Sequence, residues 1–336
     1  MTASAEGDRR AFVTAFVTLG AAGALLLPRA AHPQAARPAA RIGYLTPSTL
    51  SARGGMLELR QRLRDLGYVE GRDVRFEIRT ANEDFERLPD LAADLVRTGV
   101  DLIVAVSSPA IRAAENQTST IPIVMVSGTD PVAGLFVASL ARPGGNVTGL
   151  TTYLPELAGK RLEVLRECVP GLRRVAVLAN LRNPSSAAEA RETEAAGRAM
   201  ALDVHVIDAR LPEQYPDAFA TIARGGAGAL FVTTDPILSS NRERVMQLAG
   251  AHRLPAMYEW REIVEAGGLL AYGPSLAEVS TRVAAFVDRI LKGARPADLP
   301  VERPTRLELA VNLKTAATLG ITIPPAVLAR AERVIR

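Results

Sequence analysis

The sequence predicts an α/β protein made of two doubly wound lobes, each built on a parallel sheet. From residue 41 onward, short apolar runs rich in Val, Ile and Leu alternate with amphipathic helical patterns, which is typical of parallel sheets covered on both faces. The alternation stops near residue 152 and restarts near residue 160. At 336 residues, 48% of them hydrophobic, the chain is long enough to fold as two such units.

In the first half, the pattern predicts four strands, three helices and a further extended piece. The helix at 56–67 ends at Gly67, because glycine favours the left-handed conformation that follows many helices. The predicted strands are 41–45, 73–79, 100–106 and 121–127, the helices are 56–67, 85–99 and 109–117, and the extended piece is 146–152.

The second half repeats this order of elements. From the first predicted strand to the fourth is 80 positions in each half, from 41 to 121 and from 174 to 254. The two halves are therefore expected to share one plan. The predicted strands are 174–180, 203–208, 227–233 and 254–259, and the helices are 160–168, 186–200, 218–225 and 242–253.

The triplet Thr-Asp-Pro occurs twice, at 129–131 and at 234–236. The first triplet follows strand four of its half and the second follows strand three, so they are not copies of one repeat. Helix capping alone explains both, because Asp is a favoured N-cap and Pro is favoured at the first helical position. Ligand binding is the other interpretation, because ligands of open parallel sheets bind beyond the carboxyl ends of the strands.

Polar side chains gather at the predicted carboxyl ends of both sets of strands. Hydroxyl groups beside open helix N–H groups suit a carboxylate, and Asp130, Asp235 or Glu259 can receive an ammonium group. Two facing sheets would bring these edges to one cleft. The expected ligand-binding residues are Thr46, Ser48, Ser107, Ser108, Ser127, Thr129, Asp130, Asn180, Thr234, Asp235, Tyr258 and Glu259.

Composition and motifs argue against several other classes of function. The 40 basic and 36 acidic residues are interspersed, so nothing resembles a nucleic-acid-binding surface. The single cysteine, Cys168, excludes a disulfide within the chain. His32, His205 and His252 lack metal-ligand spacing, and there is no GxGxxG after a strand, no GxxxxGK[ST] and no GxSxG. We therefore expect no catalytic residue, no metal site and no cofactor.

The first 36 residues have the order of an export signal. Arg9 and Arg10 precede the apolar run AFVTAFVTLGAAGALLL, and small residues follow Pro28. The arginine pair suggests the twin-arginine route, although it also serves as an ordinary positive n-region. No cysteine follows the apolar run, so a bacterial lipid anchor is excluded. The sequence predicts a signal peptide at 1–36 that is cleaved on export.

Three segments resemble a known family: SLARPGGNVTGL at 139–150, EAGGLLAYGP at 265–274, and ILKGARPADLPVERPTRLELAVNLKTAATLGITIP at 290–324. They look like the bacterial ABC transporter substrate-binding proteins that have the type I periplasmic-binding-protein fold. Some members of that family are associated with aromatic amino acids such as tryptophan and tyrosine. The resemblance runs over essentially all of 41–336, and its third segment is the most specific.

The resemblance implies a monomeric periplasmic receptor, not an enzyme, whose lobes are joined by a multi-strand hinge. Such a receptor closes on a small ligand, here expected to be an amino acid or a similar molecule, and docks with an ABC permease in the inner membrane. The crossings are expected near 151–152, 272–274 and 299–304. Lobe 1 then comprises 41–151 and 274–299, and lobe 2 comprises 152–273 and 300–336. An exported ligand-sensing protein of a signalling system and an exported α/β enzyme remain the alternatives.

Overall fold

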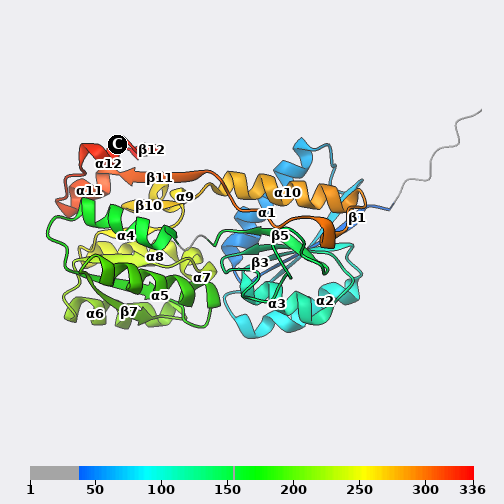
Figure 1. Cartoon of the computed structure of the whole chain (residues 1–336), viewed down its shortest axis with the longest axis horizontal. Coiled ribbons are helices and arrows are strands. Elements are labelled where there is room, and N and C mark those ends of the chain that lie inside the picture. Colours follow the sequence, from blue (N-terminus) through cyan, green and yellow to red (C-terminus); the bar gives the residue numbers. More distant parts are fainter. Residues whose placement is uncertain (1–37, 154–155) are drawn as a thin grey trace, which may run out of the picture. The chain divides into compact units, whose positions relative to one another are not determined.

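Two separate sheets form the framework of the computed structural model, which describes residues 38–153 and 156–336 (Figure 1). The predicted export signal at 1–36 lies outside the described residues. Residues 38–336 form a single compact unit, so the two sheets and their helices belong to one body. Within the described residues, no helix is both long enough and apolar enough to cross a membrane.

The first sheet has five parallel strands in the order β2-β1-β3-β4-β5. All four predicted strands and the predicted extended piece are confirmed. The strands are β1 (Ala40–Thr46), β2 (Val74–Thr80), β3 (Leu102–Val106), β4 (Ile123–Ser127) and β5 (Val147–Thr151).

Helices cover both faces of this sheet, as the continuous apolar strands predict. One face packs against α2 and α3, and the other packs against α1 and α10, which lie side by side (Figure 1). The helix α10 comes from far along the sequence and returns to the first sheet, as the family resemblance implies. The helices are α1 (Thr49–Asp65), η1 (Phe85–Arg87), α2 (Leu88–Thr98), α3 (Ser108–Gln117) and α10 (Leu276–Leu291).

The helix α1 begins at Thr49, earlier than the predicted start at Met56. Gly54 and Gly55 lie in its first half, and glycine disfavours a helix interior by about 1 kcal/mol relative to alanine. The structure gives a steric reason for one of them, since a Cβ at residue 55 would lie 2.6 Å from the hydroxyl of Tyr44. Close packing on β1 therefore requires a small residue where helix propensity alone predicts none.

The second sheet has seven strands in the order β12-β11-β10-β9-β8-β6-β7. From β7 to β10 its order matches that of the first sheet, which confirms the shared plan. Only the pairing of β11 with β10 is antiparallel among the described strands, and β12 pairs in parallel with β11, so these two strands run opposite to the other five. The strands are β6 (Arg174–Ala179), β7 (Asp203–Asp208), β8 (Ala229–Val232), β9 (Ala256–Tyr258), β10 (Leu270–Pro274), β11 (Leu307–Asn312) and β12 (Arg333–Ile335).

This sheet is also covered on both faces. One core packs it against α4, α5, α11 and α12, and the other packs it against α6, α8 and α9. Cys168 is buried in the first of these cores, as expected for a small apolar residue. The helices are α4 (Glu156–Cys168), α5 (Pro184–Ala199), η2 (Pro212–Gln214), α6 (Tyr215–Arg224), α7 (Pro236–Ser240), α8 (Arg242–Ala251), α9 (Arg261–Glu265), α11 (Leu313–Leu319) and α12 (Pro325–Leu328).

The segment between η3 (Pro296–Asp298) and β11 runs from the first sheet to the second. Its start is tied to β5, because the Thr151 N–H donates to the Glu302 carbonyl at 3.0 Å and the Glu302 N–H donates to the Gly149 carbonyl at 3.0 Å. The expected lobe boundaries themselves remain a prediction.

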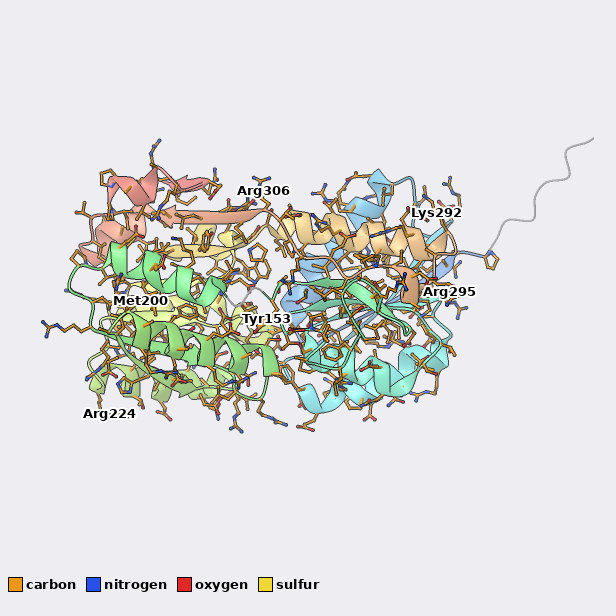
Figure 2. All side chains as sticks on the ribbon, in the orientation of Figure 1. Tyr153, Met200, Arg224, Lys292, Arg295 and Arg306 are labelled. Carbon is orange, nitrogen blue, oxygen red and sulfur yellow. The ribbon has the colours of Figure 1, made fainter. Side chains whose placement is uncertain are left out.

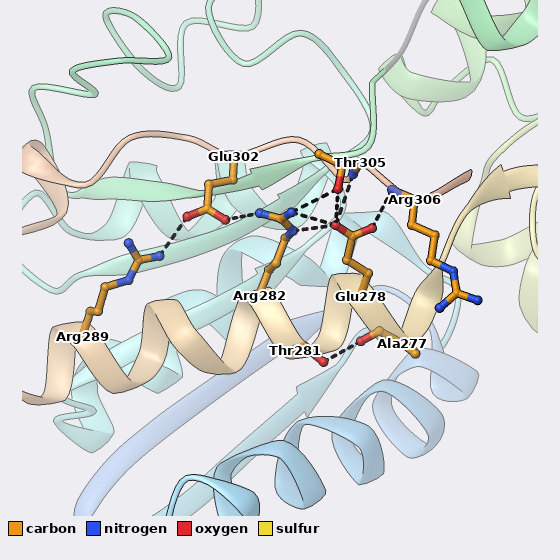
Figure 3. Close-up of polar contacts among 8 residues, drawn as sticks. All are labelled: Ala277, Glu278, Thr281, Arg282, Arg289, Glu302, Thr305 and Arg306. Atoms are coloured by element: carbon orange, nitrogen blue, oxygen red, sulfur yellow. Dashed lines mark hydrogen bonds and ion pairs between the residues drawn. The ribbon is translucent and has the colours of Figure 1, made fainter. Parts of the chain in front are cut away.

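Side chains of α10 hold the rest of this segment in place (Figure 3). Glu278 accepts hydrogen bonds from Arg282 and from the N–H groups of Thr305 and Arg306, and Arg282 also pairs with Glu302 at 2.7 Å. Burial would raise the pKa of Glu278, but these hydrogen bonds outweigh it and lower the pKa to about 2. The carboxylate of Glu278 therefore stays charged and ties the crossing segment to α10.

Candidate functional site

A cleft of about 540 Å³ lies between the two halves, at the carboxyl ends of their strands. In the first half it is lined from β1, β3 and β4 and from the helices α1 and α10, and in the second half from the segments that follow β6, β8 and β9. Sheets with this strand order bind ligands where the order reverses, between the first and third strands. The cleft occupies that place in the first half, since it meets both β1 and β3.

The first-half side of the cleft is apolar. Five valines from two strands and one helix form what we call the valine wall, and Leu59 of α1 lies beside them. Among the cleft-lining residues described on this side, Glu58 is the one charged side chain. The valine wall consists of Val104, Val106, Val126, Val279 and Val283.

Ser107, which directly follows β3, is a polar residue on this side of the cleft. It occupies the N-cap position of α3, yet its side chain makes no capping hydrogen bond. Its hydroxyl is buried, lines the cleft and has no hydrogen-bond partner among the described residues. Its backbone has φ 86°, a conformation that costs a non-glycine residue about 1–3 kcal/mol. An unpaired buried hydroxyl on a strained backbone is typical of a position that serves a ligand.

The second-half side of the cleft is polar. Thr234, Asp235 and Ser239 line it together with Arg242 and Trp260. The two Thr-Asp-Pro triplets differ here, because Asp235 lines the cleft and Asp130 is not among its lining residues.

Asp235 is buried and accepts four hydrogen bonds. One carboxylate oxygen caps α7 by accepting from Ile237 and Leu238, at 2.8 and 3.0 Å. The other accepts from the side-chain amides of Asn180 and Asn183, at 3.2 and 2.8 Å. Burial raises the pKa of Asp235, and the four hydrogen bonds oppose that rise. The capping interpretation is therefore confirmed for Asp235, whose partners leave its carboxylate little capacity for an ammonium group.

Behind this side of the cleft lies a buried charge cluster of Arg161, Glu189 and Glu259. Arg161 forms an ion pair with Glu189, and its Nη2 lies 3.8 Å from Oε1 of Glu259. It also donates to the carbonyl of Tyr272 at 2.5 Å, next to Gly273, where a Cβ would lie only 2.3 Å from the Glu259 carbonyl oxygen. Burial raises the pKa of Glu259 to about 8, and Arg161 only partly opposes this. At neutral pH the cluster therefore consists of the Arg161–Glu189 ion pair and a protonated carboxyl group on Glu259.

A small cavity of about 10 Å³, room for one water molecule, adjoins the charge cluster. Glu259, Thr234 and Tyr258 line it, together with Arg242 and Trp260 from the cleft. Tyr258 is buried in the core of the second sheet and is not among the residues that line the larger cleft.

Hydroxyl groups from both halves meet at one edge of the cleft. Ser108 lies 3.0 Å from Thr129, 3.4 Å from Ser127 and 3.1 Å from Ser185 at the start of α5, measured between side-chain oxygens. These contacts bring together three candidate residues of the first half and one residue of the second. Tyr153, labelled in Figure 2, lies in the segment that follows β5. It adds a further contact by donating to Glu192 at 2.5 Å.

The remaining candidate residues have structural contacts of their own. Thr46 accepts from the Ser48 N–H at 3.3 Å, and the Ser48 hydroxyl contacts that of Ser240 in the second half. Asp130 caps the turn that follows it, accepting from Val132 and Ala133 at 2.8 and 3.2 Å.

Sequence reasoning missed several residues that line the cleft. Arg242 lies at the start of a predicted helix, and nothing in the local pattern distinguishes it from a solvated arginine. The α10 residues of the valine wall are too far away in sequence to be associated with β3 and β4. Trp260 directly follows a candidate residue at the end of β9, and its place just past a strand end is the sequence signal that points to it.

Taken together, the cleft offers hydrogen-bonding groups and a cation on one side and an apolar surface on the other. Such a site suits the capture of a small molecule with a polar end and an apolar body. Among the described residues, no three His, Cys, Asp or Glu side chains are grouped so that they could hold a metal ion.

Comparison with known proteins agrees with this arrangement. A protein described as a tyrosine-binding protein, from Clostridioides difficile (strain R20291), is 27% identical over 275 residues, which cover 82% of this chain and 78% of that protein. An ABC domain from Streptococcus pneumoniae, solved in complex with L-Trp, superposes with a TM-score of 0.81 and 26% identity over 88% of this chain and all of that one. A conserved domain protein from Vibrio cholerae superposes with a TM-score of 0.82 and 26% identity, over 88% and 99% of the two chains.

These superpositions confirm the predicted type I periplasmic-binding-protein fold. The family model of the ABC transporter substrate-binding proteins matches residues 45–335, which include every described residue that lines the cleft except Tyr44. Its members are binding proteins that capture a small molecule for an ABC transporter. The chain belongs to the ABC transporter substrate-binding protein family.

Proposed function

We propose that this protein captures an amino acid or a similar small molecule in the cleft and delivers it to an ABC permease in the inner membrane. Ser107 carries the proposal, because its buried hydroxyl faces the cleft without a partner from a strained backbone position. The names of the C. difficile and S. pneumoniae proteins, which refer to tyrosine and tryptophan, support an aromatic amino acid as the ligand.

The proposed cycle is a hinge motion between the halves. The contacts of Ser48 with Ser240 and of Ser108 with Ser185 join side chains of the two halves, and a ligand that touches both halves would favour this closed arrangement. The protein would act as a monomer in the periplasm, without catalysis. It would reach the periplasm by means of the signal at 1–36, which is cleaved, and Arg9 and Arg10 suit the twin-arginine route.

The proposal is tested by thermal denaturation of the chain from about residue 38 with a panel of amino acids, carboxylates and sugars. A ligand at a hundred times its Kd stabilises the folded protein by about 2.7 kcal/mol, which raises the Tm by several degrees. We expect this rise with aromatic or branched amino acids. If no member of the panel raises the Tm, the proposed receptor function is wrong.

Replacing one hydroxyl tests whether the cleft holds that ligand. Ser107→Ala keeps a Cβ and therefore the same backbone strain, but it removes the group that we expect to bond the ligand. The affinity should fall roughly 3- to 10-fold, as for the loss of one hydrogen bond. Ser119→Ala, in an exposed turn, is the control and should bind like the wild type. If Ser107→Ala and Ser119→Ala bind the ligand with equal affinity, the hydroxyl group of Ser107 does not contact the ligand.

A further inference from the structure

We propose that the ligand of this cleft is an apolar carboxylate, with its carboxylate group on Arg242 and its body on the valine wall. This inference rests on the proposed receptor function and specifies the chemical class that the receptor accepts. It assigns the central recognition role to a residue that capping and strand-end arguments do not identify.

Arg242 is a cation of the cleft without a counter-ion. It is partly buried, it lines both the cleft and the adjoining small cavity, and no acidic side chain pairs with it among the described residues. Its Nε is buried and has no hydrogen-bond partner among those residues. A buried guanidinium donor without a partner is costly, and a bound anion would satisfy it.

Other arginines with an unbonded Nε differ from Arg242, because they have acidic partners. The Nε atoms of Arg60, Arg62 and Arg261 also lack hydrogen-bond partners, but each of these side chains is held by at least one ion pair. Arg261 also lines the cleft, and Glu308 holds its Nη1 at 3.0 Å. Arg242 is therefore the cleft-lining arginine that is left for a ligand, within the part of the chain that the structure describes.

The acidic groups of the cleft do not compete for Arg242. Asp235 is saturated by its four hydrogen bonds. Glu262 lies 3.4 Å from Arg261, and Glu58 lies 3.8 Å from Arg62. The planar guanidinium group binds a carboxylate through two parallel hydrogen bonds, so a carboxylate is the anion that Arg242 fits best in a site of this size.

The valine wall determines the rest of the ligand. It faces a polar second half, so a ligand whose carboxylate is on Arg242 would turn its body toward the five valines. A sugar would leave hydroxyl groups against this surface without partners, and burying unpaired hydroxyl groups disfavours binding. A purely cationic ligand would be repelled by Arg242. A branched or aromatic acid meets both requirements, whether or not it carries an amino group.

Calorimetric titration separates the contribution of the carboxylate from that of the amino group. Tyrosine, tryptophan and leucine are each titrated in three forms: the L-amino acid, the deaminated acid and the decarboxylated amine. For any side chain that the wild type binds, the L-amino acid and the deaminated acid should both bind more tightly than the decarboxylated amine. An amine that binds as tightly as its acids would overturn the inference and leave the receptor function standing.

Variants of α8 test the residue itself. Arg242→Met, which removes the charge and keeps an unbranched side chain, should lower the affinity for both acids roughly 10- to 100-fold. Arg244→Met makes the same change two residues along on an exposed part of α8 and should leave the affinity unchanged. The Tm of the two variants without ligand shows whether they are equally well folded. If Arg242→Met does not fold, Arg242→Lys serves instead, and it should bind the acids less tightly than the wild type while still preferring them to the amine.

The two possible failures are distinguishable. If Arg242→Met binds the acids as tightly as Arg244→Met does, Arg242 is not the anchor and only this inference is lost. If the wild type binds none of the nine compounds, the inference fails together with the proposal that the receptor takes such amino acids.

Discussion

Glu259 shows how burial changes the chemistry of one side chain. Its position at a strand end predicts that it receives a ligand's ammonium group, but it lies in the buried charge cluster with Arg161 and Glu189. With both carboxyl groups ionised, this cluster would carry a net negative charge away from water. Burial therefore favours the protonated form and raises the pKa of Glu259 to about 8.

This shift predicts a specific pH dependence of stability. Because the folded protein holds the proton of Glu259 more tightly than the unfolded chain does, the free energy of unfolding falls as the pH rises from 4.5 to about 8. Glu259→Gln cannot ionise, so it should lose this part of the dependence, which amounts to at most about 5 kcal/mol. Urea denaturation of both proteins at about pH 5 and about pH 9 measures the difference. Parallel pH dependences would show that Glu259 ionises in the folded state as it does in water.

The candidate residues differ in how far sequence could predict their roles. Capping chemistry is local, so the contacts of Asp130 and Asp235 with the N–H groups that follow them could be anticipated. The amides that saturate Asp235 lie more than 50 positions earlier and could not. Arg242 could not be predicted for the same reason: its role depends on which acidic groups, distant in sequence, are already paired in the folded protein.

At the scale of elements, Gly149 in the segment 139–150 has a steric explanation. Gly149 in β5 has φ 132°, a region that favours glycine, and a Cβ there would lie 2.3 Å from the carbonyl oxygen of Met125 in β4. The neighbouring strand backbone cannot move away without breaking the ladder between β4 and β5. Glycine at position 149 is therefore required by the packing of β5 on β4, beside the crossing between the halves.

Gly149→Ala should accordingly destabilise the protein strongly. We expect a loss of roughly 3 kcal/mol or more, since backbone strain adds to a clash with main-chain atoms. Gly145→Ala in the same segment is the control, because a Cβ there would meet no atom of the described residues within 4 Å. It should change stability by less than about 1 kcal/mol. Thermal denaturation compares the two variants, and equal Tm values would mean that the strand relaxes around the added methyl group.

Strands were easier to predict from sequence than helix starts. Buried parallel strands are continuous apolar runs, and each predicted run is a strand in the structure. The early start of α1 was missed because tertiary packing against Tyr44 overrides the low helix propensity of Gly54 and Gly55. The antiparallel strand β11 could be placed in the second lobe only through the family resemblance, since periodicity does not indicate pairing direction.

At the scale of the whole described chain, the cleft depends on pieces that are distant in sequence. The valine wall combines β3 and β4 with α10, which follows them by about 150 residues, and its polar counterpart comes from the second sheet. Local patterns predict each piece but not their meeting. The repeated strand plan and the family resemblance were the sequence features that indicated two facing sheets and hence a ligand between them.

The central claim is that the ligand binds in this cleft, and Trp260 offers the most direct measurement. It is the single tryptophan of the 336 residues, and it lines the cleft. Fluorescence of Trp260 should change saturably as L-tyrosine or L-leucine, whichever binds, is added to the wild type. The midpoint should match the calorimetric Kd and move to higher concentration in Arg242→Met. Heat of binding without any change in Trp260 emission would contradict the account, because the ligand would then bind outside the cleft.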